Sequence, residues 1–522
     1  MTSSSGAPCL VLALAVCAFA GPAAQAAEPE PKPPEPPAFS PGARTLHDPL
    51  LAQIGNGGYD AIHYEIELGY DPAANRFDSA STTITARATK NLSQLSLDFQ
   101  DLPVREVLVD GERARFEQVA TKPFEDPTAT VPMKLVVTPP AGIRAGRELT
   151  VEVDYSGSRP QVFTDPDGSS EGWIPACRTP PGETRTCDSS FVVGEPMGSQ
   201  AWFPSNNHPS DKATFDTTIT VPRGDTAFGA GELTGAPTDN GDGTTTWAWS
   251  EDDPTATYLV TASNGDFDYS ESKLRESATG RTLPLYTAID PSASDAQQVT
   301  LARRLGRTEE ITNFLAERYG PYPFDSNGAL VDHAPSAGYA LEVQGKAHYA
   351  SPSASQSTIV HELAHGWFGN SVTPARWSDI WLGEGWAQWS QWLWDFSDGT
   401  AAESPAQRFT SGYASGPESK WEIAPAVLDG DPANLFSTFP TYTRGAMTLE
   451  GYRQIVGDAR FDRFAKALQR DFAHANIGTR ELIDFAKRSS GLRGGERMRL
   501  ESYFQQWLYD EAKPEILPAD FR

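Results

Sequence analysis

Cysteine and cationic side chains are both scarce in this 522-residue chain. Two of the four cysteines fall in the apolar segment that opens the chain, so a single pair remains, Cys177 and Cys187. Lysine and arginine total 42 against 69 aspartates and glutamates, which gives a formal net charge of -27. A protein with such an excess of acid repels phosphate groups, so nucleic acid and anionic membranes are not expected as partners.

Long apolar runs are also missing beyond the opening segment. No later stretch approaches the roughly 20 apolar residues that a membrane-spanning helix requires, so no transmembrane span is expected. The sequence also lacks a nucleotide-binding glycine loop, a serine nucleophile elbow and an internal repeat.

The first 54 residues have the composition of a targeting segment and a tether. Residues 9–20 are apolar and small residues follow to Ala26, which is typical of a secretory signal, so we expect a signal peptide over residues 1–26. Residues 27–54 are predicted to be a Pro-rich linker. The expected location is secreted or extracellular, with the periplasm or cell surface as alternatives.

The cysteine pair fits an exported protein. Cys177 and Cys187 are predicted to lie in a loop rich in proline and glycine, and in an oxidising compartment we expect them to form a disulfide. The alternative, two free thiols of a second metal site, has no histidine nearby in the sequence to support it.

Two hydrophobic patterns divide the remainder of the chain. From residue 59 to about residue 275, apolar and polar residues alternate, as at Tyr64, Ile66 and Leu68, and this period indicates antiparallel strands. Later residues such as Leu301 and Leu305 follow helical spacing. We therefore predict an α+β fold, with an N-terminal antiparallel β domain over residues 55–275 and a mostly helical domain with a small sheet over residues 276–522.

The strongest chemical pattern is His361-Glu-Leu-Ala-His365. Two histidines four residues apart lie on one face of a helix, and the intervening Glu362 is placed to act as a general base. A second helix, predicted over residues 382–396, begins near Glu384, which would supply a third ligand. Two imidazoles and one carboxylate leave one position open for water, as in catalytic zinc sites. We predict one zinc ion per chain, held by His361, His365 and Glu384, with Asp379 as a candidate to orient an imidazole.

Several further stretches, taken with this motif, resemble the aminopeptidase N family of zinc metallopeptidases, the gluzincin aminopeptidases. The resemblance covers most of residues 55–515 and implies a β saddle packed on a thermolysin-like catalytic domain. It also implies a short, secreted, bacterial type without the family's large C-terminal helical domain. The stretches are Tyr442-Thr-Arg-Gly-Ala446, Trp202–Lys212, Tyr258-Leu-Val260, Gly265-Asp-Phe267 and Tyr319-Gly-Pro-Tyr-Pro-Phe324.

The resemblance implies roles for residues that spacing alone does not single out. It assigns Tyr442 as the hydroxyl donor to the oxyanion. It aligns the run Tyr339–Val343 with the family's Gly-x-Met-Glu-Asn strand, whose glutamate binds the free α-amine, so Glu342 is expected to anchor the substrate N-terminus. On a strand, Gln344 would share the face of Glu342 and assist it.

We therefore expect a zinc aminopeptidase that removes single residues from peptides with a free N-terminus. A zinc endopeptidase or oligopeptidase is one alternative, and it would also cleave peptides with blocked N-termini. A non-catalytic secreted binding module is another, but it requires a closed four-ligand metal site. The spare histidines nearest to His361, His333 and His348, have no spacing that would complete one.

Overall fold

The computed structural model describes residues 38–158, 160, 162–178 and 186–521. The predicted signal peptide and residues 27–37 of the predicted linker lie outside the described residues. Phe39–Arg522 forms one unit of densely connected contacts. Among the described residues, every helix is too short or too polar to cross a membrane.

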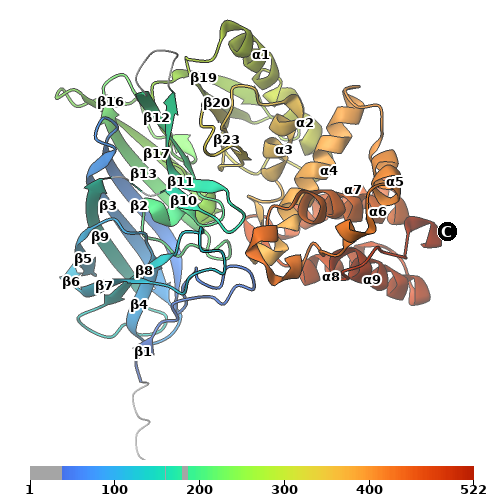
Figure 1. The fold of residues 1–522 in the computed structure, drawn as a ribbon, viewed down its shortest axis with the longest axis horizontal. Helices are drawn as coiled ribbons and strands as arrows, with labels where there is room; N and C mark the ends of the chain where they lie inside the picture. Colours follow the sequence, from blue (N-terminus) through green and yellow to red (C-terminus); the bar gives the residue numbers. More distant parts are fainter. Residues whose placement is uncertain (1–37, 159, 161, 179–185, 522) are drawn as a thin grey trace, which may run out of the picture. The chain divides into compact units, whose positions relative to one another are not determined.

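A nine-stranded sheet is the centre of the β-rich half, which is drawn in blue and green in Figure 1. In strand β2 the side chains alternate between buried Tyr64, Ile66 and Leu68 and exposed Glu65 and Glu67, as the sequence period predicts. The strands of this sheet are β2 (Tyr59–Asp71), β3 (Arg76–Ala88), β5 (Val104–Val109), β6 (Glu112–Arg113), β9 (Glu148–Ser158), β13 (Ala213–Pro222), β15 (Glu232–Leu233), β16 (Thr238–Asp239) and β17 (Thr244–Thr255).

Two smaller sheets complete this half. The first has four strands, β1 (Ser40–Pro41), β4 (Leu92–Asp98), β8 (Met133–Thr138) and β7 (Arg115–Ala120). The second has five strands, β10 (Val162–Thr164), β11 (Ser170–Arg178), β12 (Thr186–Val193), β18 (Asn264–Gly265) and β14 (Thr226–Ala227). Their inward residues share one hydrophobic core with the large sheet.

The predicted Pro-rich linker is wrong for its described part. Ser40 and Pro41 form strand β1, which pairs with β4, and Leu51 and Ile54 are fully buried in the β-domain core. The sequence signal was misleading because the first apolar residues of the domain follow directly on a proline-rich stretch. The folded chain therefore begins well before residue 55.

The two cysteines lie on strands and not in a loop. Cys177 is on β11 and Cys187 is its direct partner on the antiparallel strand β12. The structure joins them by a disulfide, as the sequence led us to expect. The bond therefore links two neighbouring strands, and the second of them, β12, ends shortly before Glu195.

A second five-stranded sheet begins the other half of the chain. Its strands are β19 (Asp268–Arg275), β20 (Thr282–Ile289), β21 (Asn327–Val331), β23 (Ala347–Tyr349) and β22 (Ala340–Leu341). Strand β19 pairs along its whole length with β20, so the predicted boundary at residue 275 falls at the end of a strand of this sheet. A short parallel pair, β24 (Val372–Pro374) and β25 (Ala475–Ile477), lies further along the chain.

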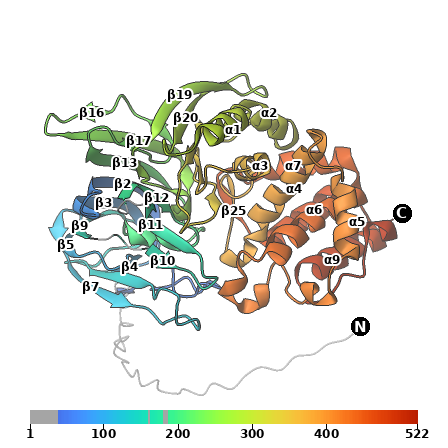
Figure 2. The same ribbon diagram turned by 45° about the horizontal axis from the view of Figure 1, so that its top comes forward.

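The rest of this half is helical, drawn in yellow to red in Figure 1, and it confirms the predicted α+β class. Figure 2 shows α4 and α6 side by side within the bundle, in agreement with their contacts. The helices are α1 (Asp295–Leu305), α2 (Thr308–Tyr319), α3 (Gln356–His365), α4 (Trp381–Ser397), α5 (Pro405–Ala414), α6 (Gly445–Val456), α7 (Asp458–Asp471), α8 (Thr479–Ser489) and α9 (Gly494–Leu508).

Aromatic packing fixes α4 in the core of this half. Its buried face carries several tryptophans, and Trp386 stacks on Phe368 with ring centroids 4.0 Å apart. Stacked aromatic pairs of this kind stabilise a core beyond the area that they bury. Since Phe368 lies shortly beyond the end of α3 at His365, the stack links that end of the helix to α4.

Candidate metal centre

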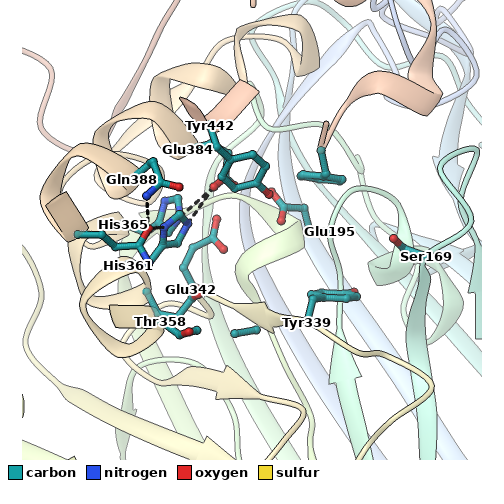
Figure 3. A pocket seen from close by; sticks show the side chains of 14 residues that line it. Ser169, Glu195, Tyr339, Glu342, Thr358, His361, His365, Glu384, Gln388 and Tyr442 are labelled. Atoms are coloured by element: carbon teal, nitrogen blue, oxygen red, sulfur yellow. Dashed lines mark hydrogen bonds and ion pairs between the residues drawn. The ribbon is translucent and has the colours of Figure 1, made fainter. Parts of the chain in front are cut away.

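Helices α3 and α4 bring the three predicted ligands together (Figure 3). The Ser355 hydroxyl caps α3, which places His361 and His365 on successive turns. Glu384 lies in the first turn of α4, where the helix dipole favours a carboxylate. Its Oε2 is 3.0 Å from Nε2 of His361 and 3.6 Å from Nε2 of His365. One ligand atom from each residue lies within 4.8 Å of the others.

The nitrogen of each imidazole that faces away from the site, Nδ1, also has a hydrogen-bond partner. Nδ1 of His361 is 3.1 Å from Oε1 of Gln391, and Nδ1 of His365 is 3.1 Å from the carbonyl oxygen of Phe368. Both partners are acceptors, so Nδ1 of each ring holds a proton and Nε2 faces the site. Nε2 can bind zinc once it has lost its own proton, and the donor set therefore fits a catalytic zinc ion.

Charges in the cluster favour a cation. Although burial opposes it, the carboxylates of Glu342 and Glu384 raise the pKa of His365 to about 10. Burial likewise opposes ionisation of Glu384, but the imidazoles of His365 and His361 lower its pKa to about 2. Two imidazoles facing three buried carboxylates form an environment that a divalent ion would neutralise.

Two glycines allow the close approach that this geometry needs. A Cβ at Gly369 would lie 2.7 Å from Nδ1 of His365, so any other residue at this position would displace the imidazole ring. A Cβ at Gly385 would lie 2.9 Å from the carbonyl carbon of Gly445, where α4 meets the start of α6. The second contact brings the segment that carries Tyr442 next to Glu384.

Asp379 does not orient an imidazole. Its Oδ1 accepts hydrogen bonds from the backbone N–H and the hydroxyl of Thr479, at 2.9 and 2.6 Å, at the start of α8. The carboxylate therefore caps a helix, and the outer contacts of the histidines come from Gln391 and a backbone carbonyl instead.

A cavity of about 330 Å³ opens beside the three ligand atoms. Its wall combines residues from the β-rich half, from the small sheet and from the helices. The lining residues are Ser169, Glu195, Tyr339, Ala340, Glu342, Thr358, His361, Glu362, His365, Glu384, Gln388, Gln391, Phe436 and Tyr442.

Glu362 lies in this wall between the two histidines of α3. It is buried, and burial raises its pKa to about 7 although His361 and His365 oppose that rise. A carboxylate with a pKa near neutrality is suited to accept and return a proton at physiological pH. The residue therefore has an acidity suited to proton transfer within this cavity.

Tyr442 projects from a π-helical turn, η7 (Thr438–Arg444), into the same cavity. Its ring lies 5.9 Å from that of His361, centroid to centroid. Burial, followed by the charge of Glu384, raises the pKa of Tyr442 well above its usual range. The hydroxyl therefore stays protonated and is available as a hydrogen-bond donor.

Buried anchors hold this turn on both sides of Tyr442. The hydroxyl of Thr441 donates to the carbonyl of Leu435 at 2.9 Å. Arg444 is fully buried, and burial lowers the pKa of its guanidinium to about 10. Its N–H groups donate to the carbonyls of Trp421, Ile423, Gln506, Trp507, Asp510 and Ala512.

Glu342 and Glu195 face the cavity from opposite halves of the chain (Figure 3). Both are buried, with 4% and 8% of their surface exposed. Burial and the charge of the neighbouring carboxylate Glu342 raise the pKa of Glu195 well above its usual range. The backbone carbonyl of Glu342 is fixed by the amide of Asn370 at 2.8 Å.

Gln344 does not join the site. Strand β22 ends at Leu341, so the alternation that would align Gln344 with Glu342 stops before either residue. The side chain of Gln344 instead hydrogen-bonds the hydroxyl of Thr255 in the β-rich half, and the residue does not line the cavity.

Among the residues that sequence reasoning missed, two have contacts that bear on the site. Glu195 lies far from the zinc motif, and Gly-Glu-Pro resembles an ordinary turn. Gln391 follows Glu384 by two helical turns, so its position on the same face of α4 was a signal that helical periodicity contained.

Comparisons with known proteins match both halves of the chain. The model of the Peptidase M1 N-terminal domain matches residues 60–259, and that of the Peptidase family M1 domain matches residues 340–507. Leucine aminopeptidase 2 of Aspergillus fumigatus is 25% identical over 419 residues, which are 76% of this chain and 62% of that protein. Aminopeptidase N of Lactococcus lactis is 25% identical over 486 residues, 87% of this chain and 51% of that protein. The chain thus spans roughly half to two thirds of these relatives.

A solved structure shows the same two-part architecture. The M1 zinc metallopeptidase from Deinococcus radiodurans is 26% identical, with a TM-score of 0.76 over 91% of this chain and 98% of that one. A mutant of that enzyme has been solved with a Tyr-Ser-Ala substrate. These matches confirm the resemblance to a family of zinc metallopeptidases.

Proposed function

Because the chain belongs to peptidase family M1, whose cofactor is zinc, we propose that it is an aminopeptidase that hydrolyses the first peptide bond of peptides with a free N-terminus. The observation that carries this proposal is the pair of carboxylates, Glu195 and Glu342, that face the cavity beside the zinc ligands. In this proposal His361, His365 and Glu384 hold the ion, which supplies a Lewis acid that polarises the scissile carbonyl and lowers the pKa of water.

Glu362 is the proposed proton carrier. Its carboxylate accepts a proton from the attacking water and delivers it to the nitrogen of the departing amine. The pKa of about 7 serves both steps, because the ionised and protonated forms are then both accessible at neutral pH. No other carboxylate in the described cavity lies between the two histidines on α3.

Tyr442 is the proposed donor to the developing oxyanion. Its phenolic O–H points into the cavity beside His361, and its high pKa keeps the proton in place. A single preorganised donor of this kind commonly contributes about 10²–10³-fold in kcat.

Glu342 and Glu195 are the proposed anchors of the α-ammonium group. Two buried carboxylates without a resident cation are unfavourable, and a substrate ammonium would neutralise them by charge-assisted hydrogen bonds. Both line the same cavity as the zinc ligands, so an amine anchored there would hold the first peptide bond of the substrate beside the metal site. This arrangement supports cleavage of a single residue at a time.

A panel of aminoacyl anilides, each paired with its N-acetylated form, tests the proposal. We expect turnover of the free amines and at least a hundredfold loss for the acetylated ones, since acetylation removes the charge that Glu342 and Glu195 bind. Equal cleavage of both forms would indicate an endopeptidase. Glu362→Gln keeps the side-chain shape but cannot carry the proton, so unchanged turnover in that variant would favour the binding-module alternative.

Secretion is a separate part of the proposal. It is supported by the apolar segment and small residues before Ala26 and by the disulfide between Cys177 and Cys187. N-terminal sequencing of the protein recovered outside the cytoplasm tests it, and we expect the mature chain to begin near residue 27. Recovery of the intact chain in the cytoplasm alone would contradict this part.

A further inference from the structure

Asn370 contacts both the zinc-binding helix and the chain segment that carries Glu342. We propose that Asn370 is a positioning residue, whose amide sets the place of the Glu342 carboxylate relative to the zinc ligands. The inference rests on the aminopeptidase function proposed above, in which Glu342 binds the α-amine. Asn370 does not line the cavity beside the ligand atoms, so it acts on the substrate only through Glu342.

Two buried hydrogen bonds make Asn370 a bridge. Its backbone N–H donates to the carbonyl of His365, the last residue of α3, at 3.0 Å. Its side-chain Nδ2 donates to the carbonyl of Glu342 at 2.8 Å. Only 2% of the residue is exposed. A buried hydrogen bond is costly to leave unmade, so these two bonds fix the distance between a zinc ligand and the amine anchor across a single residue.

The backbone of Glu342 needs this support because regular strand pairing stops beside it. Strand β22 ends at Leu341, so the ladder that it forms with β23 does not hold Glu342. Further along the segment, the N–H of Gln344 donates to the carbonyl of Leu259 in the β-rich half at 3.0 Å. The Asn370 amide therefore holds the one backbone carbonyl that belongs to the amine anchor itself.

The β-rich half in turn holds Asn370. Lys212, which directly precedes β13, donates through Nζ to the carbonyl oxygens of Asn370 and Ser371, at 2.8 and 3.2 Å. The hydroxyl of Thr373 donates to the same Asn370 carbonyl at 2.7 Å. Both the N–H and the carbonyl of Asn370 are thus fixed, so its side chain extends towards Glu342 from a set position.

Close packing makes the place of Glu342 depend on this contact. Asn370, Glu342 and Glu362 share the wall of a small cavity of about 10 Å³, which is at most the space that one water needs. The segment of Glu342 therefore has little room to move while the Asn370 amide is in place. Loss of the donor would release the carbonyl, and a displacement of about 1 Å at such a site can cost about 10²-fold in rate.

Asn370→Leu tests this role. Leucine is close to asparagine in size and removes the Nδ2 donor, whereas the lost Oδ1 has no hydrogen-bond partner among the described residues. With leucyl anilide and the zinc-loaded full-length protein, we expect kcat/KM to fall at least about tenfold, mainly through a higher KM, because the amine anchor is displaced. Zinc affinity should stay within about twofold, since the backbone bond to His365 is kept.

A double-mutant cycle with Glu342→Gln shows whether Asn370 acts through Glu342. Once the carboxylate is lost, Asn370→Leu should lower kcat/KM by less than about twofold further. Asn476→Leu is the matched control, because its amide also joins the two halves but donates to the carbonyls of Pro209 and Pro374, at 2.8 and 3.2 Å, outside the cavity wall. We expect this control to change kcat/KM by less than about twofold.

Lys212→Met gives a second reading should Asn370→Leu fold poorly. We expect it to lower kcat/KM at least about threefold, and this loss should also vanish in the Glu342→Gln background. Unchanged kcat/KM in Asn370→Leu, losses that add to that of Glu342→Gln, or an equal loss in Asn476→Leu would each overturn the positioning role and leave the aminopeptidase function intact. Failure of the unaltered protein to cleave any free aminoacyl anilide would instead reject the proposed function itself.

Discussion

Replacing Gln391 by leucine tests how the metal centre is held. Oε1 of Gln391 accepts a hydrogen bond from Nδ1 of His361, and its amide nitrogen donates to the carbonyl of Ser357 at 3.0 Å, which fixes the direction of the amide. Without this acceptor the imidazole can place its proton on either nitrogen, and only one tautomer binds zinc. The lost hydrogen bond, worth about 1 kcal/mol, and the freed tautomer together predict a 10–100-fold weaker affinity, or about 1.4–2.7 kcal/mol.

Competition of the zinc-free protein with a fluorescent zinc chelator at fixed pH measures this affinity. Gln391→Glu is the matched control, because a carboxylate still accepts from Nδ1 although it loses the donor to Ser357. We expect near-normal or tighter binding for that variant and near-normal kcat for Gln391→Leu once zinc is saturating. Zinc affinity within twofold of the wild type in Gln391→Leu would refute the reasoning.

Three other changes give separate tests. Tyr442→Phe should lower kcat about 10²–10³-fold with little change in KM, measured on an aminoacyl anilide; a KM effect alone would contradict the oxyanion role. Arg444→Met should lower kcat about tenfold, because it releases the π-helical turn that carries Tyr442. In a double-mutant cycle it should cause no further loss of kcat once Tyr442→Phe is present, and additive losses would show that Arg444 does not act through Tyr442. Burial raises the pKa of Asp211 from 3.8 to about 7, so its protonated form stabilises the fold fully below about pH 4, and this contribution is lost as the pH rises through 7. Asp211→Asn should remove this decrease in the free energy of unfolding with pH, which is at most about 1.4 kcal/mol per pH unit. Urea unfolding from pH 4 to 8 measures it, and an unchanged pH dependence would show that other groups cause the decrease.

The parts of the site that lie on regular helices were predictable from sequence. His361 and His365 follow from a four-residue spacing, and Glu384 from its place at the start of the next helix, because helical geometry fixes which side chains share a face. The change from alternating to helical periodicity likewise predicted the two-part α+β fold.

The failures occur where tertiary contacts override local pattern. Gln344 was assigned to the site on the assumption of a continuous strand, but β22 is two residues long and the chain turns towards Thr255. Glu195 reaches the cavity only because the β-rich half packs beside the zinc helices, and no spacing in the sequence encodes that contact. The described part of the proposed linker folds because Leu51 and Ile54 find a core that other strands provide.

The carbonyl of Phe368, which orients His365, belongs to a residue whose ring is stacked on Trp386 in the centre of the helical core. Loss of side-chain packing there would release the imidazole, and bound zinc in turn would resist that loss by mass action. Heating the zinc-loaded protein should therefore release the zinc ion and unfold the tryptophan-rich core in a single transition, so that intrinsic tryptophan fluorescence reports both events at one temperature.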